Sequence, residues 1–273
     1  MEKNSKIYKF IDILLNFQDV KDLELYDDQG VKVSTHTYDV LDISISKILE
    51  KYQNLENGAK NLDYFAITVG VIMHDISKSS IRRKDEDLSH SQMMIKNIEY
   101  ITDEVIEVLE IIENKAGLKI QPKTRENIIH IVLSHHGKWG KIQPETEEAE
   151  IVYIADMESA KYHRINPIQA NDILELAVNG KNIKDIEEEL NCSAAVIKDR
   201  IRRSKKELKL KTFSELLEVY KKNGKVPVGD SFFAMRAEET VKLKKLVDEQ
   251  GFYNLIIKNS LMEYMKDDEA FEE

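Results

Sequence analysis

Apolar residues recur at helical spacing along most of this chain, and few residues interrupt them. The 273 residues include only four prolines and ten glycines, the residue types that most often end helices or form turns. Residues 6 to 17 show the pattern, with Ile7, Phe10, Ile11 and Leu14 on one stripe. We therefore predict an all-α fold built from long helices.

The composition is typical of a soluble globular protein, with 42% hydrophobic and 33% charged residues. No run of about 18 apolar residues is present and the N-terminus has no secretory pattern, so we expect no membrane association. The single cysteine, Cys192, excludes an internal disulfide and favours a cytoplasmic location. A net charge of −10 argues against a whole-surface nucleic-acid binder but permits a local basic patch.

The strongest chemical pattern lies between Val71 and Ser80, where an apolar run ends in His74 and Asp75, with Lys78 three positions later. Adjacent residues point about 100° apart on a helix, so both can reach one cation near its end. Further imidazoles and carboxylates lie mostly at the starts or ends of other predicted helices. They are His36, His90, His135, His136 and Asp156. Mixed nitrogen and oxygen ligands favour Mn, Fe, Co, Ni or Zn over calcium.

Local signals place these residues on separate helices. Ser34 or Thr35 can cap a helix that carries His36 in its first turn. Asn57-Gly58 is expected to break the chain before a helix that leads into His74. Asp156 interrupts an apolar run, so its carboxylate must be paired or coordinated if it is buried. Further helices are expected from Ser89-His90-Ser91, over 124–135 and over 147–162, whereas the acidic tail 267–273 is expected to fray.

The order of His36, His74-Asp75 and Asp156 on separate helices resembles the H…HD…D signature of HD-domain metal-dependent phosphohydrolases. His90 and Ser134-His135-His136-Gly137 are similar to the branch of that superfamily with extra histidines, which often carries two metals. Residues 133–138, 148–151 and 155–156 resemble the HD module of YhaM-type 3′-5′ exoribonucleases.

The resemblance covers about residues 34 to 162. It departs at Ser77, where the family usually has Gly, and in having no oligonucleotide-binding β-barrel ahead of the domain.

The resemblance implies specific roles for these residues. His36, His74, Asp75 and Asp156 would hold a first metal, and Asp75 would bridge to a second one. His90 and His135 would hold that second metal, with His136 as a further ligand or a supporting group. Asp75, through metal-activated water, and Lys78, by neutralising phosphate charge, are the expected catalytic residues, with Lys138 a weaker candidate for the task of Lys78. The expected cofactor is one or two divalent ions of Mn, Fe, Ni, Co or Mg.

A second pattern follows Pro167. Between Ser193 and Lys211 there are eight basic and two acidic residues. Ser193 is expected to cap a helix with a basic outer face, as in a recognition helix. Its expected nucleic-acid contacts are Lys198, Arg200, Arg202, Arg203, Lys205 and Lys206.

This segment resembles the helix-turn-helix of LuxR-type regulators and of region 4 of sigma factors. The resemblance rests on Ile173-Leu174-Glu175-Leu176, Gly180-Lys181, Ile186 to Leu190, Ser193, Val196-Ile197-Lys198 and Leu208. It implies contact with DNA or RNA. The alternative is a packing or dimerisation appendage with a solvated basic face.

The predicted organisation is an HD-domain helical bundle over 1–165, a helix-turn-helix over 168–212 and a helical extension over 213–273. We expect hydrolysis of a phosphoester in nucleic acid, with RNA favoured, or in a nucleotide. One alternative is a nucleotide-sensing transcriptional regulator with little turnover. Another is a small-nucleotide phosphohydrolase whose helix-turn-helix builds a homo-oligomer.

Overall fold

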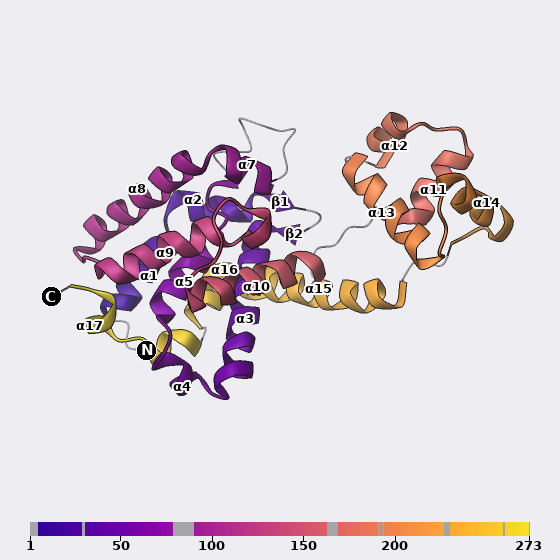
Figure 1. The fold of residues 1–273 in the computed structure, drawn as a ribbon. Helices are drawn as coiled ribbons and strands as arrows, with labels where there is room; N and C mark the ends of the chain where they lie inside the picture. The colour runs from indigo at the N-terminus through magenta and orange to yellow at the C-terminus, as the bar shows by residue number, and fades with distance from the viewer. Residues whose placement is uncertain are drawn as a thin grey trace. The chain divides into compact units, whose positions relative to one another are not determined.

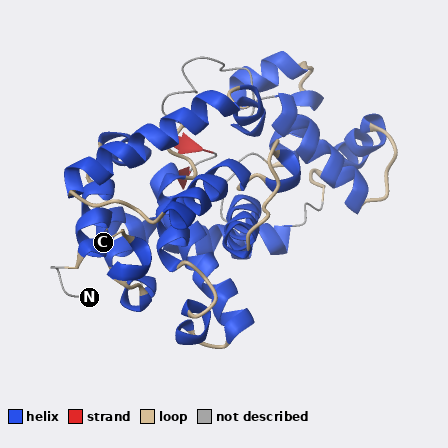
Figure 2. Cartoon of the chain, turned by 60° about the vertical axis from the view of Figure 1, so that its left-hand side comes forward, coloured by secondary structure: helices blue, strands red, loops and turns tan. Residues whose placement is uncertain are grey.

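The computed structural model describes residues 5–28, 31–78, 90–162, 169–190, 192, 194–226, 230–258 and 260–272. It confirms the all-α prediction, since among these residues the strands β1 (Asp27–Asp28) and β2 (Val31–Lys32) form just one short antiparallel pair (Figure 2). No helix in the described ranges is long and apolar enough to cross a membrane. The chain divides into two units, Met1–Arg164 with Thr240–Glu273, and Ile165–Glu239.

The first unit holds most of the helices (Figure 1). They are α1 (Lys6–Leu15), α2 (Gln18–Lys21), α3 (Val33–Tyr52), α4 (Leu55–Ala59), α5 (Tyr64–Met73), α7 (His90–Lys96), α8 (Ile98–Ala116), α9 (Pro122–Ser134), α10 (Glu147–Tyr162), α16 (Phe252–Ile257) and α17 (Asp267–Ala270). Short 3-10 turns are η1 (Asp22–Glu24), η2 (Gly137–Trp139) and η3 (Ser260–Tyr264). The unit boundary at Thr240 falls within α15 (Asp230–Gln250).

Helix α5 is the central element of the first unit, because all ten of its residues are buried. Asp63 begins it by accepting a hydrogen bond from the backbone N–H of Ala66 at 2.8 Å. Helix α5 packs against α3, α9 and α10. At Gly70 a Cβ atom would lie 2.6 Å from Cγ2 of Ile131, so the missing side chain lets α5 and α9 approach closely. This approach brings the C-terminal ends of the two helices together.

Helix α3 begins two or three residues earlier than expected, and its cap is different. Lys32 is the N-cap, whereas Ser34 and Thr35 lie inside the first turn and are buried. The predicted serine or threonine cap is therefore wrong. The reason is the β1–β2 pair, which ends at Lys32, and the backbone N–H of Val33 donates to Tyr26 O at 2.9 Å. His36 still lies in the first turn, as predicted.

The predicted break at Asn57-Gly58 is also wrong. Both residues belong to α4, whose cap is Asn54. The chain instead turns at Gln53, which has a left-handed backbone with φ of 69°, and again before Asp63. Gly58 is needed for packing, because a Cβ there would lie 2.1 Å from the Tyr64 hydroxyl.

The C-terminal tail is packed against the core, contrary to the expected fraying. Asp267 accepts hydrogen bonds from the backbone N–H groups of Lys6 and Ile7 at 2.9 Å, which caps α1. Phe271 is buried against the rings of Phe10 and Phe65, and its centroid lies 5.7 and 5.1 Å from theirs. The acidic composition predicted an exposed, frayed tail. Two aromatic contacts and a helix cap hold the segment in place instead.

In its described residues, the second unit contains the first part of α15 and four complete helices with their own apolar contacts. They are α11 (Ala170–Val178), α12 (Ile183–Leu190), α13 (Ala194–Glu207) and α14 (Phe213–Asn223). The predicted capping residue Ser193 lies outside the described residues. The contacts group α14 with α11 and α13 and place residues 240–273 with the first unit. The three-part division of the sequence stays a prediction about which segments fold independently.

Candidate metal centre

Four helices of the first unit deliver the predicted ligands to one place. His36 lies in the first turn of α3, and His74 and Asp75 follow α5 directly. Asp156 lies in the middle of α10, and His135 follows α9. The α3–α10 and α5–α9 pairs are among the most extensive helix contacts in the fold. All five side chains are buried, with Asp156 the most exposed at 8%.

Short distances connect these groups. His36 Nε2 lies 2.9 Å from Asp156 Oδ1 and 3.7 Å from Asp75 Oδ2. His74 Nε2 lies 3.3 Å from Asp75 Oδ2 and 4.0 Å from Asp156 Oδ1. The His74 and His135 ring centroids are 5.1 Å apart. Ligand atoms of His36, His74 and Asp75 all lie within 4.8 Å of one another, so a small inward movement allows metal bonds of about 2.0–2.2 Å.

Backbone carbonyls orient two of the histidines. His74 Nδ1 lies 2.7 Å from Val71 O, and His135 Nδ1 lies 2.6 Å from Val132 O. A carbonyl can only accept, so in both rings Nδ1 carries the proton and donates it. A neutral ring then keeps its lone pair on Nε2, and for His74 that nitrogen faces the carboxylates. Metal-binding histidines are commonly held in this way.

Ser159 supports His36 and was missed by the sequence argument. Its hydroxyl lies 2.9 Å from His36 Nδ1, and the serine is buried. It sits three residues after Asp156 on α10, so helical spacing could have placed both side chains on one face. A hydroxyl can donate or accept, and Ser159 therefore suits both the proton arrangement seen here and the one required when Nε2 binds a metal.

The charges of the centre shift three pKa values. Burial lowers the pKa of His74, but the charges of Asp75 and Asp156 outweigh burial and raise it above its ordinary value. Burial lowers the pKa of His135 well below its usual range, with help from His136 and His74. Burial would raise the pKa of Asp156, but the hydrogen bond and charge of His36 hold it far below its usual range. An anionic Asp156 and a neutral His135 are the forms that bind metals.

Lys78 is buried and forms an ion pair with Asp75, at 2.6 Å between Nζ and Oδ2. This contact places a positive charge beside a predicted bridging carboxylate. Ser77, which stands where the family usually has Gly, is also buried and donates to the sulfur of Met94 in α7 at 3.6 Å. The serine thus ties the turn to a neighbouring helix.

The structure gives less information about the other two predicted ligands, His136 and His90. The His136 ring lies 4.0 Å from that of His135, between centroids. His90 opens α7, but its side chain lies outside the described residues. Lys138 is exposed on η2. His130 accepts a hydrogen bond from the backbone N–H of Glu145 at 2.8 Å through Nε2.

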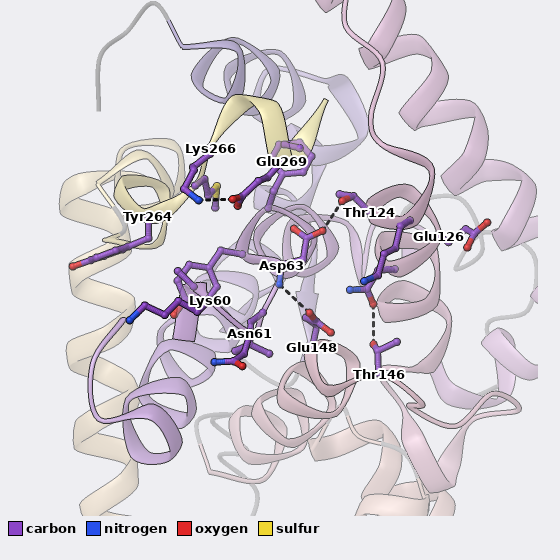
Figure 3. Close-up of a pocket in the computed structure, with 18 of the residues that line it drawn as sticks. Lys60, Asn61, Asp63, Thr124, Glu126, Thr146, Glu148, Tyr264, Lys266 and Glu269 are labelled. Carbon is purple, nitrogen blue, oxygen red and sulfur yellow. Dashed lines mark hydrogen bonds and ion pairs between the residues drawn. The ribbon is translucent and has the colours of Figure 1, made fainter. Parts of the chain in front are cut away.

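A cavity of about 670 Å³ lies at the other end of α5 (Figure 3). Its polar groups largely satisfy one another: Thr124 donates to Asp63 at 2.6 Å, the Asp63 N–H donates to Glu148 at 2.9 Å, and Lys266 pairs with Glu269. Ten helical residues, about 15 Å, separate this cavity from the metal centre. It is therefore separate from the metal chemistry.

Comparison with known sequences agrees with this geometry. Residues 33–161 match the family described as HD domain, so this part of the chain is similar to HD domains. A curated relative is the dihydroneopterin 2′,3′-cyclic phosphate phosphodiesterase of Methanocaldococcus jannaschii, 31% identical over 134 residues. The match covers 48% of this chain and 47% of the relative, so the chain spans about half the length of that relative. No solved structure gives a significant match.

Proposed function

We propose that this protein is a metal-dependent phosphohydrolase that cleaves a phosphoester of a nucleotide or nucleic acid. The observation that carries the proposal is the convergence of three buried imidazoles and two buried carboxylates from four helices. A hydrophobic core tolerates such a cluster only when its charges are compensated. A divalent ion compensates them and lowers the pKa of bound water toward about 7.

His36, His74, Asp75 and Asp156 hold the first metal in this proposal, with Ser159 and the Val71 carbonyl as supports. His135, His136 and His90 are the proposed ligands for a second ion. Lys78 neutralises charge on the bound phosphate or on Asp75. A bound divalent ion supplies hydroxide at neutral pH and polarises the phosphoryl oxygens.

Two further points bear on the class of substrate. The relative from Methanocaldococcus jannaschii is named for a cyclic phosphodiester, which supports a phosphodiester substrate here. The predicted resemblance to YhaM-type enzymes supports single-stranded RNA. We place a small phosphodiester first, because the name of this relative specifies a small cyclic phosphate.

The second unit supports a nucleic-acid contact as an additional function. Helix α13 carries the predicted basic residues, and Lys198, Arg202, Arg203, Lys205 and Lys206 are available to the solvent to varying degrees. The proposal is that this helix tethers the enzyme to DNA or RNA through phosphate contacts. The alternative is that the unit forms a homo-oligomer.

The direct test combines metal content with turnover. We expect at least one divalent ion per chain and manganese-stimulated cleavage of nucleoside 2′,3′-cyclic phosphates, single-stranded RNA or mononucleotides. Asp75→Asn is expected to lose metal and activity together, because it removes a shared ligand. Asp103→Asn, an exposed change on α8, is the control for charge. Absence of both metal and turnover in the wild type would reject the proposal.

A further inference from the structure

An exposed tryptophan, Trp139, follows His135 and His136 of the metal centre closely in the sequence. The exposed fraction is 1% at His135 and 58% at Trp139, with His136 intermediate. This short segment therefore runs from the buried metal centre to the molecular surface. We propose that Trp139 is the stacking surface for the planar, nitrogen-containing ring of the substrate. The inference rests on the proposed phosphohydrolase function and specifies the part of the substrate that binds beside the metals.

The backbone that carries Trp139 is held in place. Its N–H donates to His136 O at 3.0 Å, and the amide of Gln143 donates to Gly137 O at 2.8 Å. Gly137 has φ of +46°, and a Cβ there would lie 2.3 Å from the ring of Tyr153 in α10. Only glycine fits this position. The indole is thus presented to solvent by a turn anchored to the same two helices, α9 and α10, that contribute ligands.

The position of this exposed indole, next to the proposed metal ligands, suggests a role in binding. A single exposed apolar residue is ordinary. This one follows two predicted metal ligands within four positions, and Lys138 Nζ lies 5.2 Å from its ring centroid. An aromatic face beside an ammonium matches a ligand that joins a flat heteroaromatic ring to a phosphate. Purine nucleotides and pterin phosphates share this chemistry.

The sequence contains one tryptophan, so indole fluorescence reports on Trp139 alone. Stacking on a base is expected to quench that signal. Adenosine 2′,3′-cyclic phosphate is the first probe, and ribose 5-phosphate, which has phosphate but no ring, is the matched control. The binding measurement uses the full-length wild-type holoenzyme with rapid mixing, so that quenching is recorded before turnover. We expect saturable quenching by the cyclic nucleotide and none by ribose 5-phosphate at the same concentrations.

Kinetics with the wild-type holoenzyme provide the second readout. Base stacking is commonly worth a factor of about 10 or more in affinity. Trp139→Ala is therefore expected to raise KM about tenfold with kcat nearly unchanged, and Trp139→Phe is expected to restore most of the loss. Leu25→Ala, which removes another exposed apolar side chain, controls for general surface effects. Purine and pterin cyclic phosphates are compared in parallel to identify the ring that is preferred.

The possible results separate the two proposals. If the wild type hydrolyses no phosphoester, the phosphohydrolase proposal fails. If it does hydrolyse one but Trp139→Ala leaves KM unchanged and no quenching occurs, the stacking inference alone is rejected. Equal quenching by ribose 5-phosphate would also reject it, because that ligand has no ring to stack.

Discussion

At the scale of single residues, the groups that contact the proposed metal ligands matter as much as those ligands themselves. Val71 O and Val132 O fix the protonated nitrogens of His74 and His135, and Ser159 contacts the back of His36. Such supports orient the ring and raise its basicity, and their loss typically lowers metal affinity by 10- to 100-fold. The three contacts explain how buried imidazoles are kept ready for a metal.

Ser159→Ala is expected to weaken metal binding about tenfold while leaving the fold intact, since the change removes one hydroxyl beside His36. Isothermal titration with Mn²⁺ measures the effect. Ser46→Ala is the matched control, because that exposed hydroxyl donates to the α3 backbone at Asp42 O, 3.1 Å away. Equal affinities of wild type and Ser159→Ala would contradict the supporting role.

Metal binding is expected to strengthen as pH rises through the neutral range. Burial opposes the shift, but Asp75 and Asp156 raise the pKa of His74 above its ordinary value of 6.5 in the metal-free protein. A protonated imidazole cannot bind a metal, so the ion must displace that proton. Apparent affinity therefore falls as pH drops below the raised pKa and increases above it. Mn²⁺ titrations in several buffers, together with measured proton release, test this sign; a flat profile would contradict it.

At the scale of elements, α13 neutralises part of its own basic face. Asp199 pairs with Arg202 at 2.7 Å and with Arg203 at 2.6 Å, and Arg200 lies at 3.4 Å. The charge free to contact phosphate is thus smaller than the count of basic residues suggested. Each exposed pair contributes little to stability, so its main consequence is for binding.

Asp199→Asn is expected to increase nucleic-acid affinity about three- to tenfold at 0.1 M salt, because it frees arginines for phosphate contacts. The dependence of affinity on salt should also become steeper, by about one released counterion. Fluorescence anisotropy with labelled single-stranded RNA and duplex DNA measures both quantities. Glu188→Gln removes the same charge from the exposed surface of α12 and is the control. No binding by either the wild type or Asp199→Asn would favour the oligomerisation alternative.

At the scale of the whole molecule, the two ends of the first unit stabilise each other. Asp267 caps α1, Phe271 packs against both Phe10 and Phe65, and the Tyr253 hydroxyl donates to Asp12 at 2.5 Å. The segment that matches the HD-domain family, residues 33–161, therefore lies within a core completed by residues from both its N-terminal and C-terminal sides.

Phe271→Ala is expected to destabilise the protein by about 3–5 kcal/mol, because it leaves a cavity beside two aromatic rings. Chemical denaturation measured by circular dichroism gives the free energy of unfolding. Asp268→Ala, an exposed change on α17, is expected to have little effect. A small change for Phe271→Ala would mean that the tail is not part of the cooperative core.

The sequence by itself determined the helical class and the bounds of α10, because helical periodicity is a local property. It also supplied the proposed metal ligands, which stay a prediction, from side-chain chemistry. It also placed His36 in the first turn of its helix, although the residue that caps the turn was wrong. Tertiary structure decided the rest. The role of Ser159, the docking of Phe271, the pairing of Asp199 and the grouping of α14 depend on which helix faces meet, and no local spacing specifies that.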